Sequence, residues 1–372
     1  MSIASAGPVS HSAATGIEDR ADRDPGSAAW PVDVRERILA EVGDFLAQVP
    51  VARWCPPDVP DVLRQYATGG KCLRSTFMYL GWLCGADADA AALRASASLE
   101  LLHAFALLQD DVMDEAVLRR GEPAAHLRLS GGSPPGGPVV ARRFGESAAT
   151  LLGDLCLVWG EQMLRDSGVD AEALSRVWRD YDAMRVELAL GQYADLGNDI
   201  RTRPSLEDVL TIARAKSGNY TVARPLELGA AMAGCAEPTS TMLARYGLRI
   251  GEAFQLRDDL LGVFGSAAVT GKPEDSDLGQ HKATTVLVVA LECADPGTGR
   301  ELWELVSRPV LDAAAIARCR QLIAKSGAPE RVEAMIADRV ERAREDLHQW
   351  PLPRGRHDAL DRMARLCTAR QL

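Results

Sequence analysis

The amino-acid sequence predicts an all-α protein built as one helical bundle. From Val32 onward apolar residues recur at spacings of three and four, which is the period of amphipathic helices. The first such run contains Ile38, Leu39, Val42, Phe45 and Leu46. Runs rich in β-branched and aromatic residues are nearly absent, and the one strand candidate, residues 284–290, also fits a buried helical segment. These observations favour helices packed around a common core.

Length, composition and charge narrow the class of protein further. The 372 residues are 47% hydrophobic and 25% charged, which is enough apolar material to bury a full core. The 42 Lys and Arg residues against 52 Asp and Glu residues give a formal net charge of -10, so we expect no nucleic-acid partner. The 8 cysteines form no CxxC pair, so we expect them to be reduced and mostly buried.

The chain is expected to have one folded domain after a short leader. Residues 1–30 are rich in Ser, Ala, Gly, Asp and Arg, and are expected to be disordered. Residues 31–372 are expected to form the all-α domain, with breaks at 69–70, 130–138, 195–204, 265–281 and 350–355. No apolar run is expected to reach the roughly 18 to 20 residues of a membrane helix, and no signal-peptide core is evident. We therefore expect no membrane span and a cytoplasmic location.

An acidic cluster closes the most informative segment, which runs from Glu100 to Gly121. On a helix, Asp110 and Asp114 lie one turn apart and Asp111 is adjacent, so we expect the carboxylates to converge. Mg²⁺ relieves the repulsion between such charges because it prefers oxygen ligands. An isolated DDxxD is more often a solvated helix end. This one follows a strongly apolar run, which favours a metal site.

A second acidic pair closes another apolar stretch. Asp258 and Asp259 follow Gln255 by about one turn. Alone this pair is weak evidence. Two such clusters in an all-α chain predict a cavity in which helices on opposite sides present carboxylates to shared metals.

Lysine is rare in this chain, and its positions are informative. Four of the five lysines, Lys71, Lys216, Lys272 and Lys282, fall in turn-rich segments. There a compact ammonium group can meet phosphate oxygens. The alternative is a chance distribution of surface lysines, which we consider weaker.

Taken in order, these segments resemble the trans-isoprenyl diphosphate synthases, or polyprenyl synthetases. The matching pieces are GGKCLR, ELLH with DDVMD and RRG, GD at 153–154, Gln192 with Asp195, KSGNYT, AFQLRDD, and the stretch from TGKP to HK. The resemblance spans about Gly69 to Thr285. It implies a homodimer with an isoprenoid-synthase helical bundle around a deep central cavity, and Mg²⁺, three ions per active site, between two aspartate motifs.

The resemblance also implies roles for individual residues. Mg²⁺ on an allylic diphosphate (dimethylallyl, geranyl or farnesyl) would be bound by Asp110, Asp111, Asp114 and Asp258. The leaving diphosphate would be neutralised by Arg119, Lys216, Lys272 and Lys282. Isopentenyl diphosphate would be bound by Lys71, Arg74, His103 and Arg120, while Gln255 would orient the phosphate end or its metals. The implied reaction ionises the allylic substrate, and the isopentenyl double bond then attacks the cation.

Chain length in such an enzyme depends on what closes the far end of the cavity. Phe105, followed by Ala106, lies about one and a half turns before Asp110 on a helix. In the family, an aromatic residue here resembles the type that makes geranylgeranyl diphosphate. Leu102 or a neighbouring helix is the alternative floor, and farnesyl diphosphate the alternative product.

Two other functions compete with the synthase. A class I terpene cyclase also uses DDxxD, but its second motif is only approached by Asn198 and Asp199, because the acid falls at Glu207 and Pro204 interrupts the helix. A cyclase also has no need of a second diphosphate pocket. A non-catalytic partner subunit of a hetero-oligomeric synthase is favoured only by Gly262, which stands where the second motif usually has its third aspartate.

Overall fold

The computed structural model describes residues 24–49, 55–265 and 276–369. The elements in chain order are α1 (Trp30–Gln48), α2 (Val59–Thr68), α3 (Leu73–Leu83), α4 (Ala90–Met113), β1 (Leu118–Arg119), β2 (Glu122–Pro123), α5 (Ala125–Leu129), η3 (Ser130–Gly132), α6 (Pro138–Arg165), α7 (Ala171–Leu196), η4 (Ile200–Thr202), α8 (Leu206–Ala213), η5 (Arg214–Ala223), α9 (Arg224–Met232), α10 (Glu237–Phe264), α12 (Ser276–Gly279), α13 (Thr285–Cys293), α14 (Pro296–Val306), α15 (Ala313–Lys325), α16 (Ala328–His348) and α17 (Arg354–Thr368).

The predicted all-α class is confirmed. Within the described ranges the sheet is limited to the antiparallel pair β1 and β2. Its turn places Arg120 at φ 56° and Gly121 at φ 81°, and glycine adopts such angles at no steric cost. The segment 284–290 is helical, because α13 covers nearly all of it. Most of the predicted leader lies outside the described residues.

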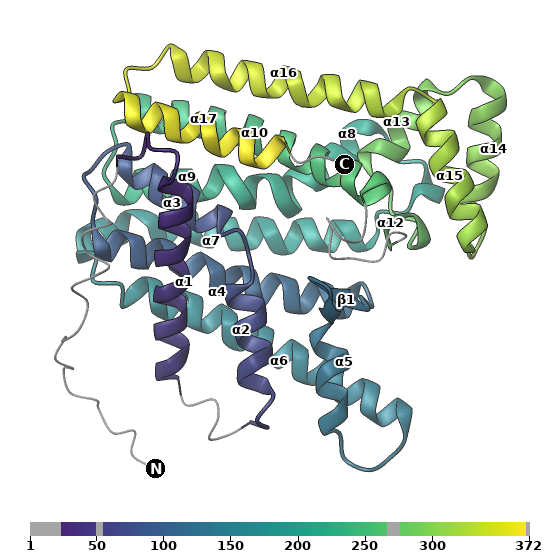
Figure 1. Ribbon diagram of the computed structural model, residues 1–372, viewed down its shortest axis with the longest axis horizontal. Helices are drawn as coiled ribbons and strands as arrows, with labels where there is room; N and C mark the ends of the chain where they lie inside the picture. Colours follow the sequence, from purple (N-terminus) through teal and green to yellow (C-terminus); the bar gives the residue numbers. More distant parts are fainter. Residues whose placement is uncertain (1–23, 50–54, 266–275, 370–372) are drawn as a thin grey trace.

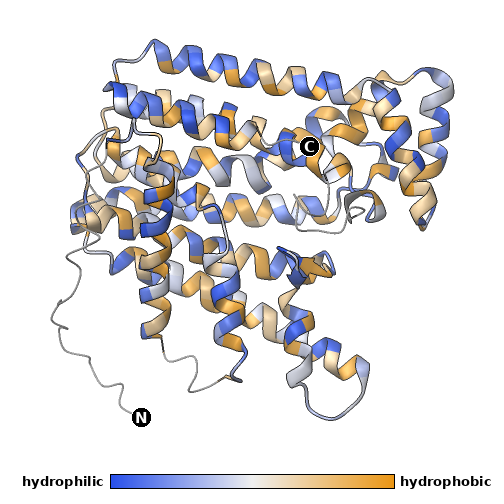
Figure 2. Cartoon of the chain, in the orientation of Figure 1, coloured by the Kyte–Doolittle hydropathy of each residue, from blue (hydrophilic) through white to orange (hydrophobic). Residues whose placement is uncertain are grey.

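The long helices pack into one bundle around two hydrophobic clusters. Figure 1 shows α10 and α16 running side by side, while α4 packs along α6. The larger cluster is built mainly from α1 to α4, α6, α7, α9, α10 and α17, and the second from α8, α10 and α13 to α16. Figure 2 shows hydrophilic and hydrophobic residues alternating along α16, as expected for a helix that buries one face.

Helix α4 corrects one expectation from the sequence. An 18-residue window of this helix has a mean hydropathy of 1.3, so by length and composition it is apolar enough to cross a membrane. However, 67% of that window is buried inside the protein. A buried core helix passes the same test as a membrane helix because both are apolar on most sides. The apolar stretch of α4 is therefore explained by its place in the bundle.

Candidate functional site

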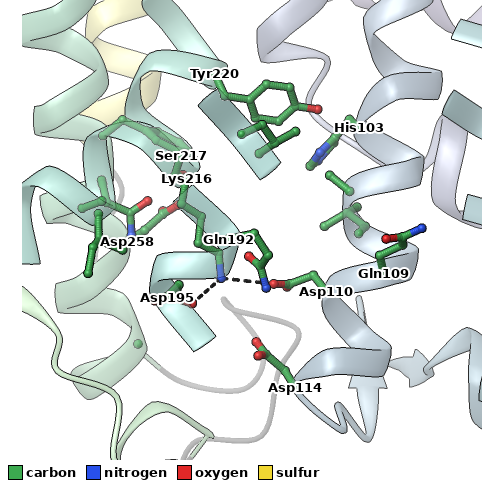
Figure 3. Close-up of a pocket in the computed structure, with 18 of the residues that line it drawn as sticks. His103, Gln109, Asp110, Asp114, Gln192, Asp195, Lys216, Ser217, Tyr220 and Asp258 are labelled. Carbon is green, nitrogen blue, oxygen red and sulfur yellow. Dashed lines mark hydrogen bonds and ion pairs between the residues drawn. The ribbon is translucent and has the colours of Figure 1, made fainter. Parts of the chain in front are cut away.

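A cavity of about 1130 Å³ opens between α4, α7, η5 and α10. Figure 3 shows acidic and basic side chains projecting into it from these elements. The cavity brings together thirteen of the residues predicted from the sequence: Lys71, Arg74, His103, Phe105, Ala106, Asp110, Asp114, Arg119, Arg120, Lys216, Gln255, Asp258 and Lys282. Lys272 lies outside the described residues.

A chain of alternating charges crosses the cavity. Lys216 Nζ lies 2.6 Å from Asp195 Oδ2 and 3.1 Å from Asp110 Oδ1 (Figure 3). Lys282 Nζ donates to Asp114 Oδ2 over 2.6 Å and lies 3.4 Å from Asp195 Oδ2. Burial by itself would raise the pKa of Asp195, but the two ammonium groups hold that pKa below its ordinary value. Two lysines thus join carboxylates from α4 and α7.

The third aspartate of the first motif has different surroundings. The side chain of Asp111 is fully buried and does not line the cavity. Asp111 Oδ1 accepts from Arg119 Nε over 2.8 Å, and Asp111 Oδ2 accepts from the Tyr66 hydroxyl over 2.6 Å. Adjacent helical residues point in directions about 100° apart, so they do not share one face. The structure therefore brings Asp110 and Asp114 together but directs Asp111 into the protein.

The second acidic pair differs from the first. Asp258 and Asp259 both line the cavity, although the side chain of Asp259 is largely buried. Asp259 Oδ2 accepts from the backbone amide of Thr285 over 2.9 Å, at the start of α13. Gln255 Nε2 donates to Asp259 Oδ1 over 2.8 Å, so Gln255 supports this contact as well as lining the cavity. Asp259 therefore joins α10 to the start of α13 while it remains part of the cavity wall.

A second basic group lies around the turn before α3. It consists of Lys71, Arg74, His103 and Arg120. Arg120 Nη1 donates to the Gln65 carbonyl over 2.7 Å, and the Arg74 guanidinium lies 4.4 Å from the ring centre of Tyr220. Burial, together with the neighbouring Arg74 and Arg120, holds the pKa of His103 well below its ordinary value, so its imidazole is neutral at pH 7. This end of the cavity suits a second anionic group.

The residues facing the cavity fit Mg²⁺ by their chemistry. Within the described ranges no group of three or more His, Cys, Asp or Glu side chains is arranged to hold a metal ion. The carboxylates of Asp110, Asp114 and Asp195 are instead paired with lysines. Mg²⁺ usually takes only one or two protein carboxylates and completes its octahedron with water and phosphate oxygens. Carboxylates that line a cavity together with basic side chains therefore match this ion.

Close backbone packing places Lys216 in the cavity. Its segment η5 is a ten-residue π-helix, a conformation that is rare and frequent at functional sites. A Cβ on Gly191 of α7 would lie 2.5 Å from the Lys216 backbone nitrogen. A Cβ on Gly218 would lie 2.9 Å from the Gly251 carbonyl oxygen of α10. Glycine at these positions lets η5 lie tightly between α7 and α10.

Three site residues received no role from the sequence. Asp195 was noted only as part of a motif, although it pairs with both lysines. Glu100 is buried in the cavity wall, and its carboxylate accepts from the Ser75 hydroxyl over 2.8 Å. Tyr220 lines the cavity next to Arg74. A carboxylate inside the apolar run of α4 was the available signal for Glu100, whereas Tyr220 offered none beyond its neighbour Lys216.

Apolar residues of the cavity wall bear on product length. Phe105 and Ala106 of α4 line the cavity, as do Leu188 and Ala189 of α7. Leu102 is fully buried and does not line the cavity. Of the two α4 residues considered as a floor, Phe105 is the one that reaches the cavity.

The near match to a cyclase motif does not form one helix. Asp199 precedes η4 and its carboxylate pairs with Arg201. Glu207 lies on α8 and pairs with Arg214 on the exterior. The residues that approach the cyclase pattern are therefore engaged elsewhere.

Comparison with known proteins agrees with this geometry. Residues 57–323 match the family model described as polyprenyl synthetase. The chain is 32% identical over 288 residues to a geranylfarnesyl diphosphate synthase of Aeropyrum pernix, which covers 76% of this chain and 84% of that protein. It is also 32% identical over 281 residues to a geranylgeranyl diphosphate synthase of Mycobacterium tuberculosis, covering 73% and 75% respectively.

Solved structures support the same assignment. The crystal structure of a geranylgeranyl pyrophosphate synthase from Corynebacterium glutamicum, complexed with isoprenyl diphosphate and magnesium, aligns with a TM-score of 0.83 at 34% identity. The alignment covers 92% of this chain and 99% of that one. A polyprenyl synthase from Caulobacter crescentus aligns with a TM-score of 0.77 at 28% identity, covering 94% and 100%. The chain belongs to the polyprenyl synthetase family and is a trans-prenyltransferase.

Proposed function

We propose that this enzyme condenses isopentenyl diphosphate with an allylic diphosphate and makes geranylgeranyl diphosphate. The observation that carries the proposal is one cavity lined by two groups of charged and polar side chains. One group combines Asp110, Asp114 and Asp258 with Lys216 and Lys282, and the other contains Lys71, Arg74, His103 and Arg120. A cyclase, which has one diphosphate substrate, has no use for the second group.

The first group would bind the allylic diphosphate. Bound Mg²⁺, for which we propose three ions per site, would supply electrostatic stabilisation of the leaving diphosphate. Asp110, Asp114 and Asp258 would hold it, while Lys216 and Lys282 would neutralise charge that develops on the diphosphate as the carbon–oxygen bond breaks. Arg119, with its guanidinium between Asp110 and Asp111, would hold the first motif in place. Ionisation is the step that these residues assist.

The second group would hold isopentenyl diphosphate beside the allylic cation. Its double bond attacks the cation, and loss of a proton leaves a chain longer by five carbons. Holding both reactants in one cavity converts a bimolecular encounter into an effectively unimolecular step. The apolar walls around Phe105 and Leu188 exclude water, which would otherwise capture the cation.

The product proposed here depends on Phe105. Its aromatic ring lines the cavity, and the chain has no insertion inside the first motif. A geranylgeranyl name among the similar proteins supports this product, although others are named geranylfarnesyl or farnesyl diphosphate synthases. Farnesyl diphosphate as end product would keep the reaction and reject the role of Phe105.

We further propose that the enzyme is a cytoplasmic homodimer. Exposed apolar residues follow one face of α6 and one face of α7, namely Leu151, Leu155 and Val158 on α6, and Val186, Leu190 and Tyr193 on α7. An ion pair of 3.0 Å between Glu161 and Arg185 joins the two helices. Contiguous exposed apolar surface of this kind is typical of a protein interface, and a second copy of this chain would cover it.

Light scattering of purified variants tests the dimer. Leu190→Glu places a charge in the proposed interface and should yield monomers. Val310→Glu changes an equally apolar, 80% exposed residue outside α6 and α7, and should leave the assembly intact. An unchanged mass for Leu190→Glu would reject this surface as the interface.

Product analysis tests the reaction. The enzyme is incubated with labelled isopentenyl diphosphate, Mg²⁺ and, in turn, dimethylallyl, geranyl and farnesyl diphosphate, and the dephosphorylated products are identified by mass. Geranylgeraniol is the expected end product, and replacing both Asp110 and Asp111 with Ala should abolish it. Hydrocarbon formed without isopentenyl diphosphate would indicate a cyclase. Absence of any product would favour the partner-subunit alternative, for which Gly262→Asp is the first variant to assay.

A further inference from the structure

The guanidinium of Arg74 lies over the ring of Tyr220 at the second diphosphate pocket. Its central carbon is 4.4 Å from the ring centre, within the range of a cation–π contact. Arg74 comes from α3 and Tyr220 from the π-helix η5, and both line the cavity. Figure 3 shows Tyr220 and His103 projecting toward the same part of the cavity from opposite walls. The contact therefore joins α3 to η5 in the cavity wall.

Three buried polar atoms converge on this part of the cavity without hydrogen-bond partners of normal geometry. They are Arg74 Nε, Tyr220 Oη and His103 Nδ1. Buried polar groups in folded proteins are nearly always hydrogen-bonded, and one left without a partner is costly. Three of them from three different elements indicate a place where a bound anion completes the contacts.

The other arginines of the site are held by oxygen acceptors. Arg119 is bound by Asp111, and Arg120 donates to the Gln65 carbonyl. In the part of the chain that the structure describes, Arg74 forms no ion pair with a carboxylate. The neighbouring Glu100 is bonded to Ser75, and burial raises the pKa of its carboxyl, which reduces the negative charge beside Arg74. The ring of Tyr220 is thus the defined contact of this guanidinium.

We propose that Tyr220 is a positioning residue, whose ring holds the Arg74 guanidinium in place for the diphosphate of the second substrate. The proposal rests on the function proposed above. A carboxylate partner would orient the guanidinium too, but it would neutralise the charge and compete with the diphosphate. An aromatic face orients a guanidinium and leaves its full charge and its N–H donors available.

The chain contains a matched control for this contact. Arg185 lies 4.5 Å from the ring centre of Tyr181 on α7, and Tyr181 is also buried and does not line the cavity. Arg185 additionally pairs with Glu161 and Asp182. This second arginine–tyrosine contact lies outside the cavity lining, so its removal reports the cost of losing a buried ring that does not face the substrate.

Steady-state kinetics of Tyr220→Leu, Tyr220→Phe and Tyr181→Leu test the proposal. Tyr220→Leu should raise the KM for isopentenyl diphosphate by about tenfold, which corresponds to about 1.4 kcal/mol for the lost cation–π contact. Its KM for the allylic substrate and its kcat should change by less than about twofold. Tyr220→Phe keeps the ring but removes Oη, so its KM for isopentenyl diphosphate should rise less than that of Tyr220→Leu. Tyr181→Leu should resemble the wild type after correction for any loss of folded protein.

The pair Arg74→Gln and Tyr220→Leu separates positioning from a general structural effect. If the ring acts through Arg74, the double variant should have the same KM for isopentenyl diphosphate as Arg74→Gln alone. Additive effects, or an unchanged KM in Tyr220→Leu, would overturn the proposal. Should Tyr220→Leu fail to fold, Tyr220→Met keeps more of the side-chain volume and serves the same comparison. Wild-type enzyme that does not consume isopentenyl diphosphate would instead reject the proposed function.

Discussion

Lys216 donates to Asp195 over 2.6 Å, and through this contact the π-helix η5 is tied to the end of α7. The same ammonium group lies 3.1 Å from Asp110 on α4. Burial by itself would lower the pKa of Lys216, but the two carboxylates raise it above its ordinary value, so the lysine is charged at neutral pH. A protein cation therefore lies among the carboxylates proposed to bind Mg²⁺.

Replacing Lys216 should change how Mg²⁺ binds. Because the ammonium competes for Asp110 and Asp195, the wild type should bind Mg²⁺ alone weakly and more tightly with inorganic pyrophosphate. Lys216→Met should bind Mg²⁺ alone about tenfold more tightly than the wild type, equivalent to about 1.4 kcal/mol. Isothermal titration calorimetry measures the Mg²⁺ affinity of each variant with and without inorganic pyrophosphate. Lys325→Met removes an exposed lysine on α15 and should behave as the wild type, whereas equal Mg²⁺ affinity in Lys216→Met would contradict the competition.

Substitutions at the two adjacent aspartates of the first motif should have different effects. Loss of Asp111 should mainly lower stability, and loss of Asp110 should mainly lower activity. Asp111→Asn leaves Arg119 buried without its full counter-charge, and should lower the free energy of unfolding by about 3 kcal/mol. Asp110→Asn changes a cavity-facing group and should cost about 1 kcal/mol or less, while lowering kcat by about 100-fold. Urea unfolding and product assays measure the two effects. Equal losses of stability would show that Asp111 is not the anchoring member of the pair.

Substitution of Phe105 should change the length of the product. Phe105→Ala removes an aromatic ring from the cavity wall, so products should be longer than those of the wild type by at least one five-carbon unit. Leu102→Ala alters a fully buried residue on the same helix, and should cost about 2 to 5 kcal/mol of stability without changing product length. Mass analysis of the dephosphorylated products measures their chain length. An unchanged chain length in Phe105→Ala would show that another residue limits the length of the product.

Glu100 should make stability depend on pH. Burial raises the pKa of its carboxyl above the ordinary value of about 4.5, although Ser75 and Arg74 act in the opposite direction. The folded state therefore holds this proton more tightly than the unfolded state, and the associated stability is lost as pH rises from about 4.5 through the folded pKa. Glu100→Gln cannot titrate and keeps an acceptor for Ser75. Its melting temperature relative to the wild type should rise with pH across this window, and a constant difference would refute the assignment.

Gly191 should matter because of its neighbour on η5. In Gly191→Ala the new methyl group would lie 2.5 Å from the Lys216 backbone nitrogen, so η5 must shift and kcat should fall by about tenfold or more. Gly43→Ala in α1 meets no atom within 4 Å, and should stabilise the protein by roughly 0.5 to 1 kcal/mol. The kcat and the melting temperature are measured for both variants. A fall in kcat in Gly191→Ala alone would indicate displacement of Lys216, because Gly43→Ala reports the effect of replacing a helical glycine elsewhere. Wild-type kcat in Gly191→Ala would show that Lys216 tolerates the shift.

Much of the fold and site was predictable because the signals are local. The three-and-four spacing predicted helices, and the five turn-rich breaks coincide with or adjoin the ends of helices in the structure. Asp110 and Asp258 could be predicted to line a cavity because carboxylates that close an apolar helical run are unusual, whereas Lys216, expected in a turn, lies in the π-helix η5. The partition between Asp110 and Asp111 was not predictable, since adjacency in sequence says nothing about which side chain meets Arg119 and Tyr66.

The sequence by itself determined the helical class, the family and the set of charged residues available for phosphate chemistry. Periodicity and residue type are properties of a local segment, and they survive whatever the segment packs against. Only the tertiary structure decided which of these charges are neighbours. Lys216 and Asp195 are 21 residues apart and Lys282 and Asp114 are 168 apart, and each pair meets because segments distant in the sequence pack together in the bundle. The same packing placed Tyr220 under Arg74, a contact that no local pattern encodes.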